Sequence, residues 1–238
     1  MTLPEFSLPG YERLLQGLQD AGHELLPVED MPRRAGDGSR VVFLRHDIDA
    51  HLTGVTRLAE IEEGLGVRST WMVATGLHYN PGSEPNVDII TRLFDRGHRI
   101  GLHYRQESVT AIADEKTHLG WCGCAVTSCC AHQPARLPIP QGEADFIDRQ
   151  MVDLVHPHHP DFAGITYVSD SRRQWRDDTI ARLLNREGPA QAHLNLHPEH
   201  WLGPPGETRH QAIARITAAM LADTASAARE IRDGWHLP

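Results

Sequence analysis

The most informative stretch of the chain is Val41-Val42-Phe43-Leu44-Arg45-His46-Asp47-Ile48-Asp49. It opens with an apolar run, which predicts a short buried strand of the kind found in parallel sheets. It then becomes polar and acidic, at the point where such a strand should end. In parallel α/β folds the ligand site lies beyond the carboxyl ends of the strands. The stretch therefore predicts an α/β fold with a functional site at the end of this strand.

Apolar runs alternate with helical periodicity on both sides of this stretch, and the alternation predicts a parallel sheet wrapped by helices. The expected strands are 41–44, 69–73, 99–102, 125–129, 165–168 and 192–196. The expected helices are 11–18, 53–64, 87–95, 143–154, 178–187 and 208–233, and 27–38 should be a loop. No linker divides the chain. We expect a single domain, 1–238, in which 1–38 form a helix and loop before the first barrel strand.

The composition excludes several classes of protein. With 238 residues, 40% hydrophobic and 23% charged, the chain suits a soluble globular domain and is too apolar to stay disordered. A net charge of −9 should repel phosphate backbones and anionic lipids, so we expect neither a nucleic acid nor a membrane as a partner. The 16 histidines point weakly towards metal ligation or proton transfer.

The N-terminus has no pattern of a secretion signal and no window has the apolar length of a membrane span, so we expect a cytoplasmic protein. The cysteines Cys122, Cys124, Cys129 and Cys130 lie close together in the sequence and should be reduced. A second zinc site made by these cysteines near His118 is an alternative, but their spacing differs from paired Cys-x-x-Cys motifs. Buried thiols are the favoured interpretation.

Polar clusters follow four of the expected strands. They are His46-Asp47-Ile48-Asp49, His103-Tyr104, Cys130-Ala131-His132 and His197-Pro198-Glu199-His200-Trp201. Asp47 and Asp49 are two residues apart, so on an extended strand end they point to the same side. A single cluster of this kind is commonly a turn or a cap. Four such clusters, each at a strand end, predict one shared pocket.

These clusters carry a resemblance to a known family. Leu44-Arg45-His46-Asp47-Ile48-Asp49, Gly97-His98-Arg99-Ile100-Gly101-Leu102-His103-Tyr104, Tyr167-Val168-Ser169-Asp170-Ser171 and Leu196-His197-Pro198-Glu199-His200-Trp201 are similar to motifs of the polysaccharide deacetylase (NodB-homology, carbohydrate esterase) superfamily. The chain resembles a divergent, cytoplasmic-type member. The resemblance implies a distorted (β/α) barrel and a metal-dependent hydrolase of C–N bonds.

The resemblance also implies roles for individual residues. Asp47 resembles the general base, and His197 resembles the general acid. Asp49 and His103 resemble metal ligands. The implied cofactor is one divalent ion, with zinc expected, because zinc bound by imidazole and carboxylate polarises a carbonyl and lowers the pKa of its water to about 7.

The sequence departs from the family pattern in two places. Many members have a second metal-binding histidine four residues after the first, and here that position is Glu107. We expect His132 to be the third ligand, with Glu107 as the alternative. The segment that contains Gln133 stands where the family has an arginine that holds the base, and Arg136 or Arg45 could supply that charge.

The expected function is removal of an N-acyl group, acetyl or formyl, from an amino sugar or a sugar-containing small metabolite. The residues expected to contact the substrate are Arg45, Tyr104, Asp170, Trp175 and Trp201. One alternative is hydrolysis of a cyclic amide or ureide, which the same resemblance allows. The other is a catalytically silent carbohydrate-binding homologue. The oligomeric state is not evident from the sequence.

Overall fold

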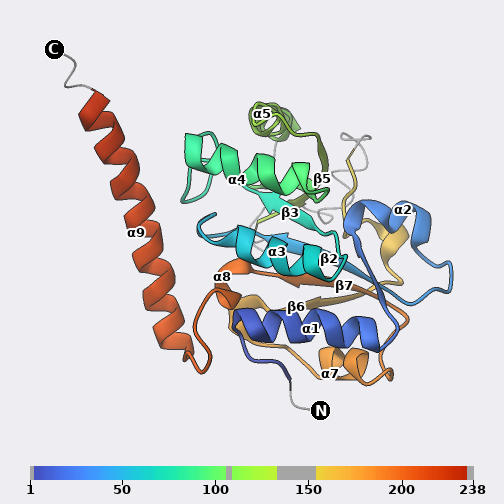
Figure 1. Ribbon diagram of the computed structural model, residues 1–238. Coiled ribbons are helices and arrows are strands. Elements are labelled where there is room, and N and C mark those ends of the chain that lie inside the picture. The colour runs from blue at the N-terminus through green and yellow to red at the C-terminus, as the bar shows by residue number, and fades with distance from the viewer. Residues whose placement is uncertain (1–2, 106–108, 133–153, 235–238) are drawn as a thin grey trace.

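The computed structural model describes residues 3–105, 109–132 and 154–234, and within them the chain forms a seven-stranded parallel sheet with helices around it (Figure 1). The strands are β1 (Glu24–Pro27), β2 (Val41–Asp47), β3 (Thr70–Val73), β4 (Arg99–Tyr104), β5 (Val126–Ala131), β6 (Thr166–Ser169) and β7 (Gln191–Leu196). The order across the sheet is β5-β4-β3-β2-β7-β6. The chain is therefore an α/β protein, as the alternating pattern predicts.

Strand β2 occupies the centre of the sheet and is buried along its whole length. On one edge it pairs with β7, from Val41 opposite Gln191 to His46 opposite Leu196. On the other edge β1 pairs with the first half of β2 and β3 with the second half. The carboxyl end of β2 consequently lies between those of β3 and β7, where several strand ends supply side chains to one place.

Helices cover one face of the sheet. Figure 1 shows α1 (Leu8–Asp20), α3 (Val55–Gly64) and α4 (Glu84–Asp95) side by side across it. The larger apolar core fills the space between these helices and the sheet, with Leu14, Leu44 and Leu194 among its buried members. Ser7 begins α1 by accepting a hydrogen bond from the amide of Gly10, which satisfies one of the free amides of the first turn.

The opposite face of the sheet carries a smaller apolar cluster that includes Val41, Phe43, Met72 and Cys130. Residues Val28 and Met31 complete it from η1 (Val28–Asp30) and α2 (Met31–Arg34). The remaining elements are α5 (Val109–Gly120), η3 (Pro160–Phe162), η4 (Ser171–Arg173), α7 (Thr179–Leu184), α8 (Pro198–Trp201) and α9 (Arg209–Gly234). Alternate residues of β2 thus pack into two apolar layers, one on each face of the sheet.

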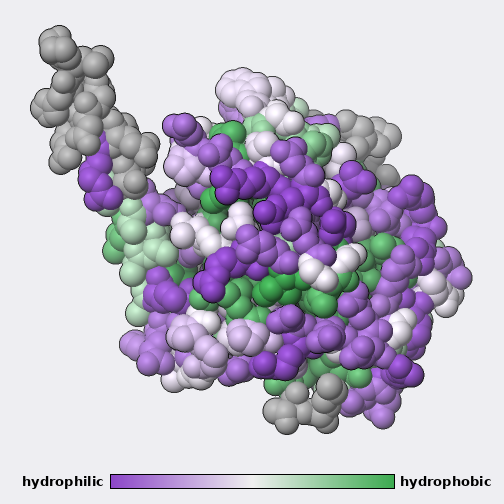
Figure 2. Space-filling model, viewed as in Figure 1, coloured by the Kyte–Doolittle hydropathy of each residue, from purple (hydrophilic) through white to green (hydrophobic). Residues whose placement is uncertain are grey.

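The outer helix α9 projects from the body of the molecule. Figure 2 shows apolar side chains on the middle part of this helix. Ile213 and Leu221 of α9 are exposed. None of the described helices combines the length and apolar character that crossing a membrane requires.

A charged network lies within the core on the helix side of the sheet. Glu62 of α3 is completely buried. One of its oxygens is 2.6 Å from His46 Nε2 and accepts a hydrogen bond from the Tyr11 hydroxyl. The other accepts from Ser69 Oγ at 2.6 Å and lies 3.3 Å from His98 Nδ1. Burial alone would raise the pKa of Glu62, but His46 and the hydrogen bonds hold that pKa below its usual value.

The expected strands are all present, but three of them extend further than their apolar runs. Strand β2 continues through Arg45 to Asp47, because these two polar side chains lie on the same face and satisfy each other. Strands β4 and β5 likewise run on to Tyr104 and Ala131. The prediction of a plain loop over 27–38 is wrong, since η1 and α2 lie there, and β1 and α5 were not predicted. The expected helix 143–154 lies outside the described residues except for Leu154, which is not helical.

The prediction of a distorted barrel is supported in part. The structure has a parallel α/β sheet, which is compatible with a barrel-like fold. Among the described residues, β5 and β6 do not pair with each other. Ser128 of β5 instead forms a parallel bridge with Val155, so the segment that precedes β6 lies against β5.

Candidate functional site

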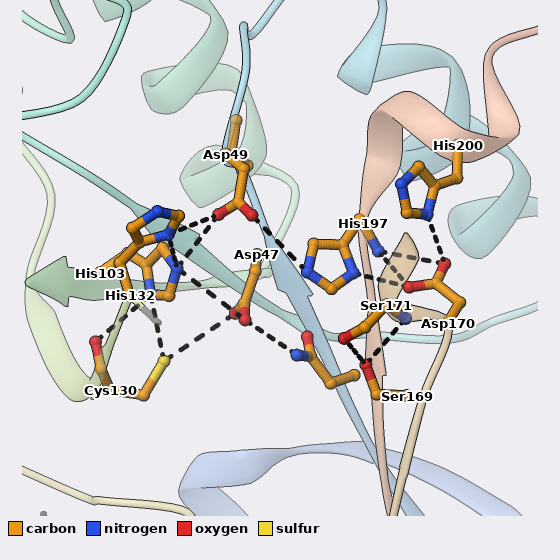
Figure 3. A network of polar contacts seen from close by, with 12 residues as sticks. Asp47, Asp49, His103, Cys130, His132, Ser169, Asp170, Ser171, His197 and His200 are labelled. Carbon is orange, nitrogen blue, oxygen red and sulfur yellow. Dashed lines mark hydrogen bonds and ion pairs between the residues drawn. The ribbon is translucent and has the colours of Figure 1, made fainter. Parts of the chain in front are cut away.

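The carboxyl ends of β2, β4, β5 and β7 bring five of the predicted side chains together (Figure 3). Asp47 ends β2 and Asp49 follows it. His103 lies in β4, and His132 follows β5. His197 follows β7 and begins α8. Residues far apart in the sequence therefore converge at the edge of the sheet where the polar clusters were predicted to meet.

Three of these side chains form a set of metal donors. Asp49 Oδ1 lies 3.2 Å from His103 Nε2 and 3.1 Å from His132 Nδ1, and the two nitrogens are 3.2 Å apart. Ligands about 2.0–2.1 Å from a tetrahedral zinc ion are separated by about 3.3–3.4 Å, so only a slight spreading would accommodate the ion. The donor types, one carboxylate and two imidazoles, also suit zinc. These residues fit a divalent cation.

The carboxylate of Asp47 is held rigidly beside this set. Arg45 Nη2 donates to Asp47 Oδ2 at 2.9 Å, and Arg45 Nε lies 2.9 Å from Oδ1. Asn195 Nδ2 donates to Oδ2 at 2.8 Å. Burial would raise the pKa of Asp47, but the Arg45 charge outweighs it and keeps the pKa below its usual value. Asp47 is therefore an oriented, ionised carboxylate.

His197 faces the site from the other side. Its Nδ1 lies 2.6 Å from Asp170 Oδ1, and its Nε2 lies 3.7 Å from Asp49 Oδ2. Burial alone would lower the pKa of His197, but the hydrogen bond to Asp170 and the charges of Asp170 and Asp49 raise it to about 10. The ring is thus an imidazolium at neutral pH, with Nε2–H directed towards the site.

Asp170 is hydrogen-bonded to His197. It is completely buried and accepts from the His197 amide at 3.0 Å and from Trp201 Nε1 at 2.8 Å. Burial would raise the pKa of Asp170, but the hydrogen bond to His197 and the nearby His200 outweigh that effect and lower it. Asp170 and Trp201, which were both predicted to contact the substrate, are completely buried and bind each other.

Two further residues that were predicted to contact the substrate are also buried. Tyr104 is completely buried in the helix-side core, since its neighbour His103 takes the opposite face of β4. Arg45 is 3% exposed and is engaged with Asp47, which is the role the sequence analysis offered it as an alternative to Arg136. Trp175 is partly buried and stacks on Phe6, with ring centroids 5.9 Å apart.

Sequence reasoning did not assign a role to Asn195 or Glu199. The signal for Asn195 is its spacing of two residues from His197, which places it on the site face of β7. Glu199, in α8, is 5% exposed, and burial together with the Asp49 charge raises its pKa to about 7. Because its pKa is close to neutral pH, the charge of this buried carboxyl contributes to the electrostatics of the site.

The cysteines do not converge on one point. Cys129 and Cys130 are adjacent in β5 and belong to the apolar layers on opposite faces of the sheet. The thiols of Cys122 and Cys124 lie near the carbonyls of Pro81 and Leu119, at 3.7 and 3.9 Å. All four are buried thiols, as the favoured interpretation predicts.

The third ligand can be tested directly, although Glu107, Gln133 and Arg136 lie outside the described residues. Replacing His132 by alanine removes one of the three converging donors, so zinc affinity should fall by more than the roughly 10–100-fold typical of losing a residue that only orients a ligand. Glu107→Ala should leave zinc affinity nearly unchanged. Equilibrium competition with a chelator measures both. The opposite ranking would make Glu107 the third ligand.

Comparisons of this chain with protein-family models and with curated proteins find no match. Function is therefore argued from the site itself. Its described residues include a donor set, Asp49, His103 and His132, that could hold a cation. A fixed carboxylate, Asp47, and a protonated imidazole, His197, lie beside this set. Such a site can bind a divalent ion, accept a proton at one point and donate a proton at another.

Proposed function

We propose that this protein is a metal-dependent hydrolase that removes an acetyl or formyl group from the nitrogen of an amino sugar or a sugar-containing small metabolite. The observation that carries the proposal is that Asp47, 3.9 Å from His103 Nε2, and His197, 3.7 Å from Asp49 Oδ2, both lie beside the donor set and have opposite charges at neutral pH. Amide hydrolysis needs both states, because water must lose a proton and the departing amine must gain one. The resemblance to polysaccharide deacetylases supports the substrate class.

The donor set of Asp49, His103 and His132 would hold the ion, which supplies polarisation of the amide oxygen and a lower pKa for water when it is bound. Asp47 takes a proton from the attacking water as the C–O bond forms. His197 gives its Nε2 proton to the amide nitrogen as the C–N bond breaks. The products are a carboxylic acid and an amine.

The remaining residues of the site keep these two groups in place. Arg45 and Asn195 fix the orientation of the Asp47 carboxylate and keep it ionised. Asp170 occupies His197 Nδ1, so the proton available for transfer is the one on Nε2. Positioning of this kind matters because a proton acceptor or donor must lie within hydrogen-bond reach of its target.

The test is Asp47→Asn, which preserves the shape of the side chain but removes the proton acceptor. We expect turnover to fall by about 10²-fold or more while zinc binding is retained. Release of acetate or formate from a panel of N-acylated amino sugars measures turnover, and metal analysis of the same samples measures zinc. Asp95→Asn, which changes an exposed carboxylate at the end of α4, is the matched control.

Three outcomes would overturn the proposal. Full turnover of zinc-loaded Asp47→Asn would remove Asp47 as the base. A zinc-loaded wild-type protein that cleaves a cyclic ureide but no N-acylated sugar would replace the substrate class, and one that binds sugars without cleaving any substrate would make the chain a binding protein.

A further inference from the structure

One side of His103 faces away from the metal donors. Its Nε2 lies towards Asp49 and His132, whereas its Nδ1 is 3.2 Å from Cys130 Sγ and 3.3 Å from the Cys130 carbonyl oxygen. The pairing of β4 with β5 places His103 directly opposite Cys130, so the sheet itself fixes this contact. Cys130 is completely buried.

The same sulfur also reaches the proposed base. Cys130 Sγ lies 3.9 Å from Asp47 Oδ1, in a direction that lets the thiol donate to the carboxylate (Figure 3). Asp47, His103 and Cys130 therefore form one compact group. Cys130 thus contacts both a metal donor, His103, and the proposed base, Asp47.

We propose that Cys130 is a positioning residue that couples His103 to Asp47. Its sulfur and its carbonyl oxygen share the Nδ1–H of His103, and its S–H is directed to Asp47 Oδ1. Fixing the proton on Nδ1 leaves the lone pair of Nε2 available to a cation, and partners of this kind strengthen metal binding by histidine. The inference rests on the metal site and base of the proposed function, but it concerns zinc affinity and does not depend on the substrate.

The neighbouring residue provides a matched control. Cys129 has the same side chain, lies in the same strand and is also completely buried. It belongs to the helix-side core rather than to the site. A general effect of losing a buried thiol would be similar in Cys129→Ala and Cys130→Ala, whereas positioning of His103 would be lost in the second variant alone.

The experiment is chelator competition for zinc on the full chain. We expect Cys130→Ala, which keeps the carbonyl acceptor, to weaken zinc affinity by about 10-fold, the lower end of the usual effect of losing such a partner. Cys130→Ser keeps an oxygen that can accept and donate, so it should recover most of that loss, and Cys129→Ala should match the wild type. Wild-type affinity in Cys130→Ala would overturn the proposal, and so would equal losses in the two alanine variants.

A second measurement holds even where Cys130→Ala does not fold. In the zinc-loaded wild type, ¹H–¹⁵N spectra of the histidine rings should show a His103 Nδ1–H protected from exchange, and Cys130→Ser should shift it. A zinc-loaded His103 without a proton on Nδ1 would overturn the proposal. Zinc binding with the expected variant pattern but no hydrolysis would instead contradict the proposed function alone, and a wild type that binds no zinc would overturn both.

Discussion

Asp49→Ala should abolish both stoichiometric zinc binding and detectable hydrolysis. Asp49 is the common member of the donor set, within 3.2 Å of a nitrogen of His103 and of His132. It is also the only carboxylate in that set. Its removal leaves two protein donors, whereas zinc sites usually have three or four. The affinity should fall far more than the roughly 10–100-fold that is lost with a residue that only orients a ligand.

Metal analysis after dialysis and turnover of the same sample would measure this effect, with Asp95→Asn as the control. Thermal unfolding of the metal-free proteins shows whether the variant is folded. Retention of one zinc per chain in Asp49→Ala would contradict the assignment. The ion would then belong to another described group of donors, either Asp47, His103 and Cys130 or Asp170, His197 and His200.

Glu62→Ala should destabilise the fold by about 3–5 kcal/mol, the cost of removing one partner from a buried ionic network. The carboxylate supports groups from four elements or their flanks, Tyr11, His46, Ser69 and His98, and water cannot replace it at a completely buried position. This is a large part of the 5–15 kcal/mol by which domains are usually stable. Urea unfolding measures the loss. Glu60→Ala, on the same helix but exposed, should change stability little.

The same carboxyl predicts how stability depends on pH. Its pKa is lower in the folded protein than in the unfolded chain, where it is about 4.3. Ionised Glu62 therefore stabilises the fold above that value, and this contribution disappears as the pH falls through the folded pKa. Glu62→Gln should show a flatter loss of stability than the wild type below about pH 4.5. Parallel curves would show that Glu62 does not contribute to acid unfolding.

The sequence predicts the sheet well because buried parallel strands have continuous apolar runs, as in 41–44 and 192–196. It is less informative where polar residues enter a strand. Arg45 and Asp47 extend β2 because each satisfies the other inside the protein, and this pairing depends on tertiary structure. The short strand β1 and helix α2 were missed since Pro27, Pro32 and nearby charges are typical of a loop.

The site was predictable in outline because chain order places each polar cluster at a strand end. The convergence of Asp49, His103 and His132 follows from that rule. The expected substrate contacts were less successful. The two-residue period of a strand already opposes His103 to Tyr104, which should have assigned Tyr104 to the core. The burial of Trp201 depends on the direction in which α8 leaves β7, and no local pattern reports that direction.

Strand β2 has an additional consequence for folding fidelity. His46 faces the Glu62 network, while Arg45 and Asp47 face the site. A slip of β2 by one residue would push a guanidinium and a carboxylate into the apolar layer beneath the helices and leave Glu62 without its histidine. The misaligned strand would be less stable on both faces of the sheet. The polar residues of the candidate site therefore also favour the correct register of β2.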